Sequence, residues 1–189
     1  PRCWRVPADR ALINRFGINN KGVKHAVEQL KKNRPEVIVA ANISKNTSSI
    51  NEDAAKDYET SFGLLYDFVD MFVVNVSCPN VHGGGMSFGT SPEQAAAVTR
   101  AVRAVTTKPI IIKLSPNVTD IVSIAKACEE AGADGISLIN TMLGMRINLR
   151  TRKPVIANTM GGFSGPAIFP VAVRMVYQVA NAVNIPVVG

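Results

Sequence analysis

Polar side chains stand at the ends of several apolar runs, where they are well placed to do chemistry. Asn42, Asn75, Lys113 and the pair Asn140-Thr141 each lie toward the end of a run rich in Val, Ile and Ala. A polar group inside an apolar strand costs stability unless something uses it. In a parallel α/β fold, the carboxyl ends of the strands open onto one face, where ligands bind. The pattern predicts a binding site at that face.

Two residues at this face point to particular chemistry. Asn, Ser and Thr also cap helices and shape turns, so Ser44, Ser115 and Thr141 have a purely structural interpretation as well. Lys113 has no capping role on a strand, so it needs an anionic or electron-rich partner. Cys78 is the only cysteine at this face, and a thiol acts as nucleophile or base when a neighbour lowers its pKa. Cys78 and Lys113 are the candidate catalytic residues.

The other cysteines and histidines indicate no further centre. Cys3 lies in the N-terminal segment and Cys128 on the apolar stripe of a predicted helix, so both are expected to be structural. His25 and His82 do not have metal-ligand spacing, and three cysteines without a C-x-x-C pair predict neither a zinc site nor a disulfide framework. No metal site is predicted, and the cysteine pattern fits a reducing compartment.

Two glycine-rich segments flank the candidate site. Gly83-Gly84-Gly85 lies in a long loop at about residues 81–90, which is interpreted as a lid or as a plain connector. The segment 161–165 (GGFSG) precedes a predicted helix, so its backbone N–H groups are placed to meet an anion.

Five apolar runs alternate with five helical patterns. The predicted strands cover residues 37–44, 71–77, 109–115, 135–141 and 186–189. The predicted helices cover residues 23–30, 54–66, 92–105, 121–131 and about 170–183; the third begins with a capping Ser91 followed by proline, and the fourth stops at Gly132. Near-continuous apolar runs are typical of parallel strands that are covered on both faces.

This alternation predicts an α/β fold with right-handed crossovers and a parallel sheet. The repeat of roughly 30 residues is that of a TIM-type (β/α)8 barrel. Residues 145–149 and 153–157 flank a polar turn, which predicts a β-hairpin inserted before the last strand. About five strands cannot close an eight-stranded barrel. We therefore expect residues 1–189 to form a single barrel domain, present as an incomplete internal fragment truncated at both ends.

The net charge of +7 raises the question of a nucleic-acid partner. Basic residues are scattered, aromatic residues make up only 6% of the chain, and RNA-binding motifs are missing, so nucleic acid is not expected. A surface excess of Lys and Arg, or attraction of anionic ligands, explains the charge better. No apolar run reaches the roughly 18 residues that a membrane helix needs.

Six short motifs run in order along the chain. They are NRFGINN (14–20), ANISKN (41–46), NVSCPN (75–80), KLSPN (113–117), INT (139–141) and GGFSG (161–165). In these motifs the sequence resembles the dihydroorotate dehydrogenases, flavin enzymes of pyrimidine synthesis. The pair NVSCPN and KLSPN is the most specific. Residues 1 to about 74 resemble class 2, the membrane-associated quinone-reducing enzymes, whereas the chain from about residue 81 resembles the cytosolic, NAD-linked class 1B.

The resemblance implies a role for each matching residue. Cys78 would be the base that removes the C5 proton of dihydroorotate, and Lys113 would place its cation beside the flavin edge where negative charge grows. The implied FMN contacts are Asn42, Asn75, Lys113, Ile139 and Gly165. The implied substrate contacts are Asn14, Arg15, Phe16, Gly17, Ile18, Asn75, Asn80, Asn140 and Thr141. An Asn amide suits such a ring because it offers both a donor and an acceptor to an imide.

The same resemblance implies the partners. Dihydroorotate is the expected substrate, orotate the product and FMN the cofactor, and the electron acceptor stays open among a quinone, NAD through an iron–sulfur/FAD subunit, and fumarate. A homo-oligomer is expected. So is a cytoplasmic location, or membrane association if the parent belongs to class 2. The family's first two strands, phosphate-binding turn and eighth strand are expected to be absent, so the chain alone should bind FMN poorly.

Two other functions fit the same residues. The flavin domain of dihydropyrimidine dehydrogenase has a similar strand–Cys–Pro loop and a similar KL-x-PNVTDIVSIA stretch, and it acts on uracil-type rings that lack a carboxylate. NRFGINN and INT favour orotate. The third hypothesis is a catalytically incomplete barrel fragment that serves as a binding or assembly module, because unpaired sheet edges invite association.

Overall fold

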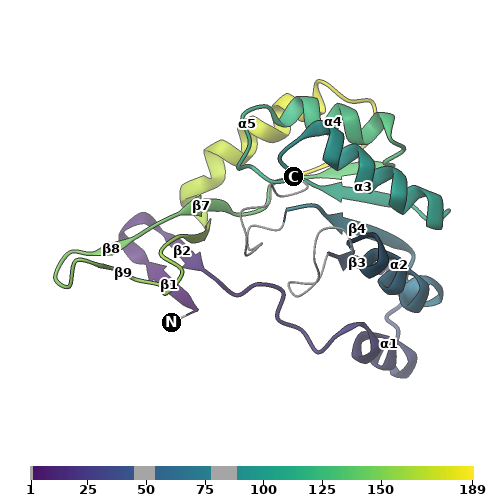
Figure 1. Cartoon of the computed structure of the whole chain (residues 1–189), viewed down its shortest axis with the longest axis horizontal. Helices are drawn as coiled ribbons and strands as arrows, with labels where there is room; N and C mark the ends of the chain where they lie inside the picture. The colour runs from purple at the N-terminus through teal and green to yellow at the C-terminus, as the bar shows by residue number, and fades with distance from the viewer. Residues whose placement is uncertain (1, 45–53, 78–88) are drawn as a thin grey trace.

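The computed structural model describes residues 2–44, 54–77 and 89–189 (Figure 1). The strands are β1 (Cys3–Val6), β2 (Ala11–Asn14), β3 (Ala40–Ile43), β4 (Met71–Asn75), β5 (Ile110–Lys113), β6 (Gly135–Ser137), β7 (Met142–Gly144), β8 (Ile147–Asn148), β9 (Lys153–Pro154), β10 (Gly161–Ser164) and β11 (Val187–Val188). The helices are α1 (Val23–Lys32), α2 (Ala54–Leu65), α3 (Pro92–Val105), α4 (Ile121–Glu130) and α5 (Phe169–Ala180). Strands and helices alternate as predicted, with β7–β10 inserted before α5.

Five strands form one parallel sheet in the order β11-β6-β5-β4-β3. Asn75 of β4, Lys113 of β5 and Ser137 of β6 lie abreast in the register. Because successive residues of a strand face opposite sides, these three share a face with Val73 and Ile111, and their neighbours face the other way. The five predicted parallel strands are confirmed, and each is shorter than predicted.

The main core lies between this sheet and its helices. Phe72 and Val74 of β4 are fully buried, and the ring centroid of Phe72 lies 4.1 Å from that of Phe62 in α2. Helices α4 and α5 add Ile124 and Val179 to the same cluster. The helices therefore pack on one face of the sheet, and the half-buried side chains at the strand ends belong to the opposite face.

Among the described residues, side chains cap the starts of α3 and α4, and the first of these caps was predicted. The hydroxyl oxygen of Ser91 accepts a hydrogen bond from the backbone N–H of Gln94 (3.3 Å), and Pro92 opens α3. Asp120 Oδ1 accepts from the backbone N–H of Val122 (3.0 Å) at the start of α4. These bonds satisfy donors that the first turn of a helix leaves unpaired.

A second, antiparallel sheet in the order β1-β2-β10-β7 was not predicted. It has a small core of its own, formed by Val6, Ala11, Ile13, Val155 and Ile156. Segment 161–165 was predicted to lead into a helix, but Gly161–Ser164 forms strand β10 and a 3-10 turn at Pro166–Ile168 precedes α5; binding of an anion by its N–H groups stays a prediction. Glycine is depleted in strands, so the local sequence gave no strand signal here.

The predicted strand 135–141 ends early, at Ser137 of β6. The chain then crosses from the parallel sheet to β7 of the antiparallel sheet. Asn140 and Thr141 lie in this crossing (residues 138–141), and the backbone N–H of Asn140 donates to the carbonyl of Leu114 just after β5 (3.1 Å). The two polar residues therefore belong to the link between the sheets and not to a strand end.

The predicted hairpin is confirmed by the antiparallel pairing of β8 with β9. Figure 1 shows it projecting beyond the antiparallel sheet, away from the helices. At the base of the hairpin, Val155 and Ile156 are buried in the small core, whereas Leu149 near the tip is 84% exposed. The hairpin is thus anchored at one end and open to solvent at the other.

Replacement of Phe72 by alanine should destabilise the protein strongly. The ring is fully buried against Phe62, so its loss is expected to lower the free energy of unfolding by about 3–5 kcal/mol, measured by urea denaturation. Phe169→Ala is the matched control, because that ring is 67% exposed and should cost under about 0.5 kcal/mol. Equal losses in the two variants would contradict the core described above.

Candidate functional site

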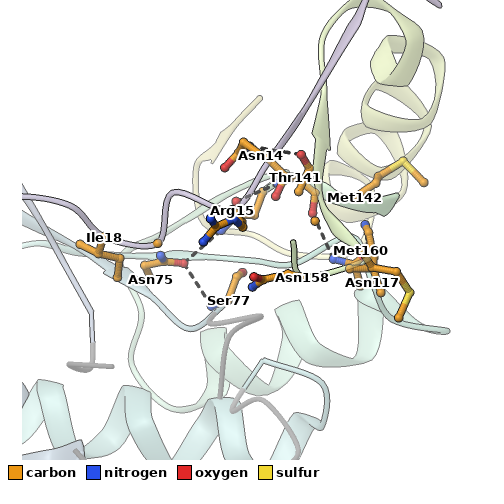
Figure 2. A pocket seen from close by; sticks show the side chains of 15 residues that line it. Asn14, Arg15, Ile18, Asn75, Ser77, Asn117, Thr141, Met142, Asn158 and Met160 are labelled. Atoms are coloured by element: carbon orange, nitrogen blue, oxygen red, sulfur yellow. Dashed lines mark hydrogen bonds between the residues drawn. The ribbon is translucent and has the colours of Figure 1, made fainter. Parts of the chain in front are cut away.

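A cavity of about 380 Å³ lies where the carboxyl ends of the parallel strands meet the antiparallel sheet. Figure 2 shows side chains from both sheets gathered around it, with Asn14 and Thr141 together on the upper side and Asn75 and Ser77 below. The lining residues are Asn14, Arg15, Gly17, Ile18, Asn75, Ser77, Asn117, Asn140, Thr141, Met142, Leu143, Asn158, Met160, Gly161 and Gly162. Amide side chains are frequent in this wall, which suits a planar ligand rich in donors and acceptors.

A network of amides fixes the wall that comes from the parallel sheet. Asn75 Oδ1 accepts hydrogen bonds from Asn140 Nδ2 (3.3 Å) and from the backbone N–H of Ser77 (3.1 Å). Asn140 Oδ1 in turn accepts from the backbone N–H of Thr141 (2.8 Å). Because Oδ1 of Asn75 is used twice, its Nδ2 is the end left to meet a ligand among the described residues. The network therefore orients the donor and acceptor ends of two amides before any ligand arrives.

The opposite wall depends on a glycine. Asn14 Nδ2 donates to the carbonyl of Gly162 (3.1 Å), and Asn14 Oδ1 accepts from the backbone N–H of Phe16 (3.3 Å). A Cβ atom on Gly162 would lie 2.6 Å from Thr141 Oγ1 and 3.3 Å from Asn14 Nδ2. The absence of a side chain at Gly162 thus lets Asn14 and Thr141 lie side by side at the cavity.

Lys113 adds a cation next to this network. It lies beside Asn75 in the register, and Ser77 Oγ donates to its carbonyl (3.4 Å). Burial lowers the pKa of Lys113 because it disfavours the charged form. Within residues 2–44, 54–77 and 89–189 its ammonium group has no hydrogen-bond or ion-pair partner. A half-buried, unpaired cation fits an anionic or electron-rich group of a ligand.

The structure brings most of the predicted substrate contacts together. The cavity lining contains Asn14, Arg15, Gly17, Ile18, Asn75, Asn140 and Thr141. Phe16 is absent from the lining, and its side chain is exposed. Cys78 and Asn80 lie outside the described residues, as do His82 and the loop glycines 83–85.

The predicted cofactor contacts are more dispersed. Asn42 lines a second cavity of about 730 Å³, together with residues of the α1 start such as Lys21 and His25. Ile139 packs on the main core. Gly165 has a φ of +113°, and a Cβ there would lie 2.7 Å from the carbonyl oxygen of Arg10, so this position requires glycine for backbone reasons.

Two amides in the cavity were not predicted as site residues. Asn117 belongs to the KLSPN stretch, where its place beside Lys113 was the available signal. Asn158 lies between the hairpin and β10 and had no local signal, because its position follows from the antiparallel sheet.

Other candidate chemistry receives no support from the described residues. Within them, His, Cys, Asp and Glu form no group of three or more that could hold a metal ion. Cys128 is fully buried, and burial raises its pKa to about 11, so it is a structural thiol as predicted. No helix in the described part of the chain is both long enough and apolar enough to cross a membrane.

Comparison with known proteins identifies the family. The family model for dihydroorotate dehydrogenase matches residues 1–189. This chain belongs to the dihydroorotate dehydrogenase family. The family resemblance seen in the motifs is therefore confirmed.

Two curated relatives are catalytic subunits of the B type. The "Dihydroorotate dehydrogenase B (NAD(+)), catalytic subunit" of Alkaliphilus metalliredigens is 51% identical, over 94% of this chain and 58% of its own length. The protein of the same name from Desulforamulus reducens is 49% identical, over 100% of this chain and 60% of its own length. The similarity to B-type subunits therefore includes the N-terminal part of the chain, whose motifs resemble class 2. The chain spans about three fifths of the length of these relatives.

Solved structures show the fold. The ligand-free DHODH of Eimeria tenella has a TM-score of 0.75 with this chain at 23% identity, covering 99% of this chain and 60% of that one. The complex of the same enzyme with ferulenol has a TM-score of 0.72. The five parallel strands are accordingly part of a (β/α) barrel, and the predicted fold class is confirmed.

Lys113 should titrate below an ordinary lysine. Because its folded pKa is lowered, the folded chain binds this proton more weakly than the unfolded chain does, so protonation of Lys113 disfavours folding and the penalty fades as pH rises through the folded pKa. NMR titration of the lysine side chains, with Lys113→Arg identifying the resonance, measures this directly. A midpoint at or above the usual lysine value would contradict the burial argument.

Gly162→Ala should destabilise the antiparallel sheet. The added Cβ collides with Thr141, and overpacking of this kind costs roughly 1–3 kcal/mol. Gly63→Ala in α2 is the control: a Cβ there meets nothing within 4 Å, and a helix gains up to about 1 kcal/mol from this change. Urea denaturation of both variants measures the difference, and a Gly162→Ala protein as stable as the parent would show that the close approach is not needed.

Proposed function

We propose that this chain carries out the FMN-dependent oxidation of dihydroorotate to orotate, in the de novo synthesis of pyrimidines (UMP). The observation that carries the proposal is the amide-lined cavity beside the unpaired, half-buried Lys113. Family membership and the names of the B-type relatives support it. Since the chain spans about three fifths of those relatives, the activity is proposed for this chain as part of a barrel of their length.

The cavity residues fit the two recognition features of the substrate. The ring carries alternating carbonyl and N–H groups, and the amides of Asn14, Asn75 and Asn140 supply donors and acceptors for them. The substrate carboxylate needs a positive partner, and Arg15 contributes a guanidinium to the same lining. A uracil-type ring would meet the amides but has no carboxylate to bring to the guanidinium. Dihydroorotate is therefore the favoured substrate.

Lys113 is the described residue that best fits the cofactor. Its cation is half-buried without a partner, as expected of a group that meets an electron-rich ring edge. The proposed FMN contacts are Asn42, Asn75, Lys113, Ile139 and Gly165. Bound FMN supplies the acceptor for the hydride that leaves C6 of the substrate. Lys113 would stabilise the negative charge that accompanies this transfer.

Cys78 is the proposed base. It follows Ser77, a buried residue whose backbone N–H is held by Asn75 in the cavity wall. The thiolate would take the proton from C5 while the hydrogen on C6 leaves with its electron pair. The substrate then gains a C5–C6 double bond and becomes orotate. A thiol is a base of the type that this proton transfer requires, and Cys78 is the residue that the resemblance assigns to it.

The partners are proposed from the relatives and from one surface. The relatives are named as NAD(+)-type catalytic subunits, which favours NAD through an iron–sulfur/FAD subunit over a quinone or fumarate. The exposed apolar side chains of Met145, Ile147 and Leu149 on the projecting hairpin support a contact with another subunit or a second copy in a homo-oligomer. The free thiols of Cys3 and Cys128 agree with a cytoplasmic location.

Anaerobic flavin bleaching tests the function. The chain, extended to the length of its B-type relatives and loaded with FMN, should lose its visible flavin absorbance with dihydroorotate and not with dihydrouracil. Cys78→Ser should slow this bleaching by about 10²-fold or more, because general-base catalysis typically contributes that much, while orotate binding is retained.

Other outcomes separate the alternatives. Bleaching by dihydrouracil alone would favour the uracil-type function, and a protein that binds no flavin would favour the incomplete binding module. Equal bleaching rates for Cys78→Ser and the parent would remove Cys78 from the mechanism.

A further inference from the structure

The side chain of Asn117 bridges two segments on which the cavity depends. Its Nδ2 donates to the backbone carbonyl of Thr141 (3.1 Å) and to Ser115 Oγ (3.2 Å). Its Oδ1 accepts from the backbone N–H of Leu143 (2.7 Å). One amide therefore ties the segment after β5 to the chain on both sides of Met142, where the crossing enters β7.

The first part of the crossing has hydrogen bonds of its own: the backbone N–H of Leu138 donates to the carbonyl of Val188 (3.0 Å), and Asn140 Nδ2 donates to Asn75 Oδ1 (3.3 Å). The backbone N–H of Asn140 donates to the carbonyl of Leu114 (3.1 Å), and that of Thr141 donates to the side chain of the preceding Asn140 (2.8 Å). Pairing with β10 begins only at Met142. The carbonyl of Thr141 and the N–H of Leu143 thus depend on Asn117 for the hydrogen bonds that fix their direction.

Asn117 is itself well placed to act as an anchor. Its backbone N–H donates to Ser115 Oγ (3.2 Å), and Ser115 is buried. Ser115 follows β5 two residues after Lys113, so the anchor is continuous with the strand that presents the cation. Any shift of Asn117 relative to β5 would move the carbonyl of Thr141 and the N–H of Leu143 relative to Lys113.

We propose that Asn117 is a positioning residue for ring recognition. It holds the end of the crossing so that Thr141 presents its polar groups to the cavity at a fixed distance from β5, whereas Asn140 is held by Asn75 and Leu114. This inference deepens the proposed function and rests on it for the identity of the ligand. Because Asn117 is exposed, its hydrogen bonds contribute little to overall stability, so its loss should weaken ligand binding more than folding.

Orotate binding tests the proposal in the FMN-loaded protein of full family length. Asn117→Ala should raise the Kd for orotate by about tenfold, as expected for lost hydrogen bonds that orient binding groups. Asn117→Asp keeps the acceptor for Leu143 but places an oxygen against the carbonyl of Thr141, so it should weaken binding to at least the same extent. Asn181→Ala is the matched control, because that exposed Asn donates to the carbonyl of Tyr177 (2.7 Å) and does not line the cavity, and it should leave the Kd unchanged.

A double-mutant cycle separates positioning from direct contact. If Asn117 acts through the crossing, its replacement in a Thr141→Val background should raise the Kd by under about threefold, because neighbouring residues that act together are non-additive. Fully additive effects would show that Asn117 does not act through Thr141 and would overturn the proposal. An unchanged Kd for Asn117→Ala would also overturn it.

Amide hydrogen exchange gives a readout that needs no ligand. Exchange at Leu143 should become faster in Asn117→Ala than in the parent, and Asn181→Ala should leave it unchanged. If the parent protein fails to bind orotate, the proposed function fails, and exchange at Leu143 still decides whether Asn117 holds the crossing. Unaltered exchange in Asn117→Ala would overturn that role.

Discussion

The close approach of β10 to its neighbours is the constraint on which the site depends. A Cβ on Gly161 would lie 2.4 Å from the carbonyl oxygen of Asn14, and one on Gly162 would lie 2.6 Å from Thr141 Oγ1. Only residues without side chains let β2, β10 and the crossing meet at this distance. Glycine weakens a strand, since it loses more backbone entropy on folding and packs no side chain. Without side chains at these two positions, the antiparallel sheet packs over the carboxyl ends of the parallel strands. The cavity is the space between the two sheets.

The parallel sheet contributes the opposite kind of constraint, which is electrostatic. Alternation along the strands sends Phe72 and Val74 into the helices and brings Asn75 and Lys113 to the other face. Partial burial lowers the pKa of Lys113, so the protein holds a cation where its charged form is disfavoured. The amides can satisfy one another in the absence of a ligand, but the lysine has no partner among the described residues. Lys113 is thus the group of this site that gains most from an anionic or electron-rich ligand.

Sequence patterns predicted the elements that form between residues close together in the chain. The apolar runs gave the parallel strands, and the polar turn gave the hairpin, because both depend on residues that are near in sequence. The antiparallel sheet escaped prediction because Asn14 pairs with Gly162 across 148 residues and because glycine does not indicate a strand. Asn75, Asn140 and Thr141 were predicted and do lie together, although the last two reach the cavity from a crossing between sheets. Asn117 was missed as a site residue since its role depends on where that crossing runs.

Recognition and stability depend on different sets of contacts. The fully buried cluster around Phe72 belongs to the parallel sheet and its helices, whereas the hydrogen bonds of the cavity are half-buried or exposed and contribute less to folding. In the proposed function, the ring is held by Asn75, which ends β4, and by Asn140, which follows β6, and the carboxylate is met by Arg15, which follows β2 of the antiparallel sheet. A family built on this barrel can therefore change how it treats the carboxylate by altering the segment after β2, while ring recognition and the core stay as they are.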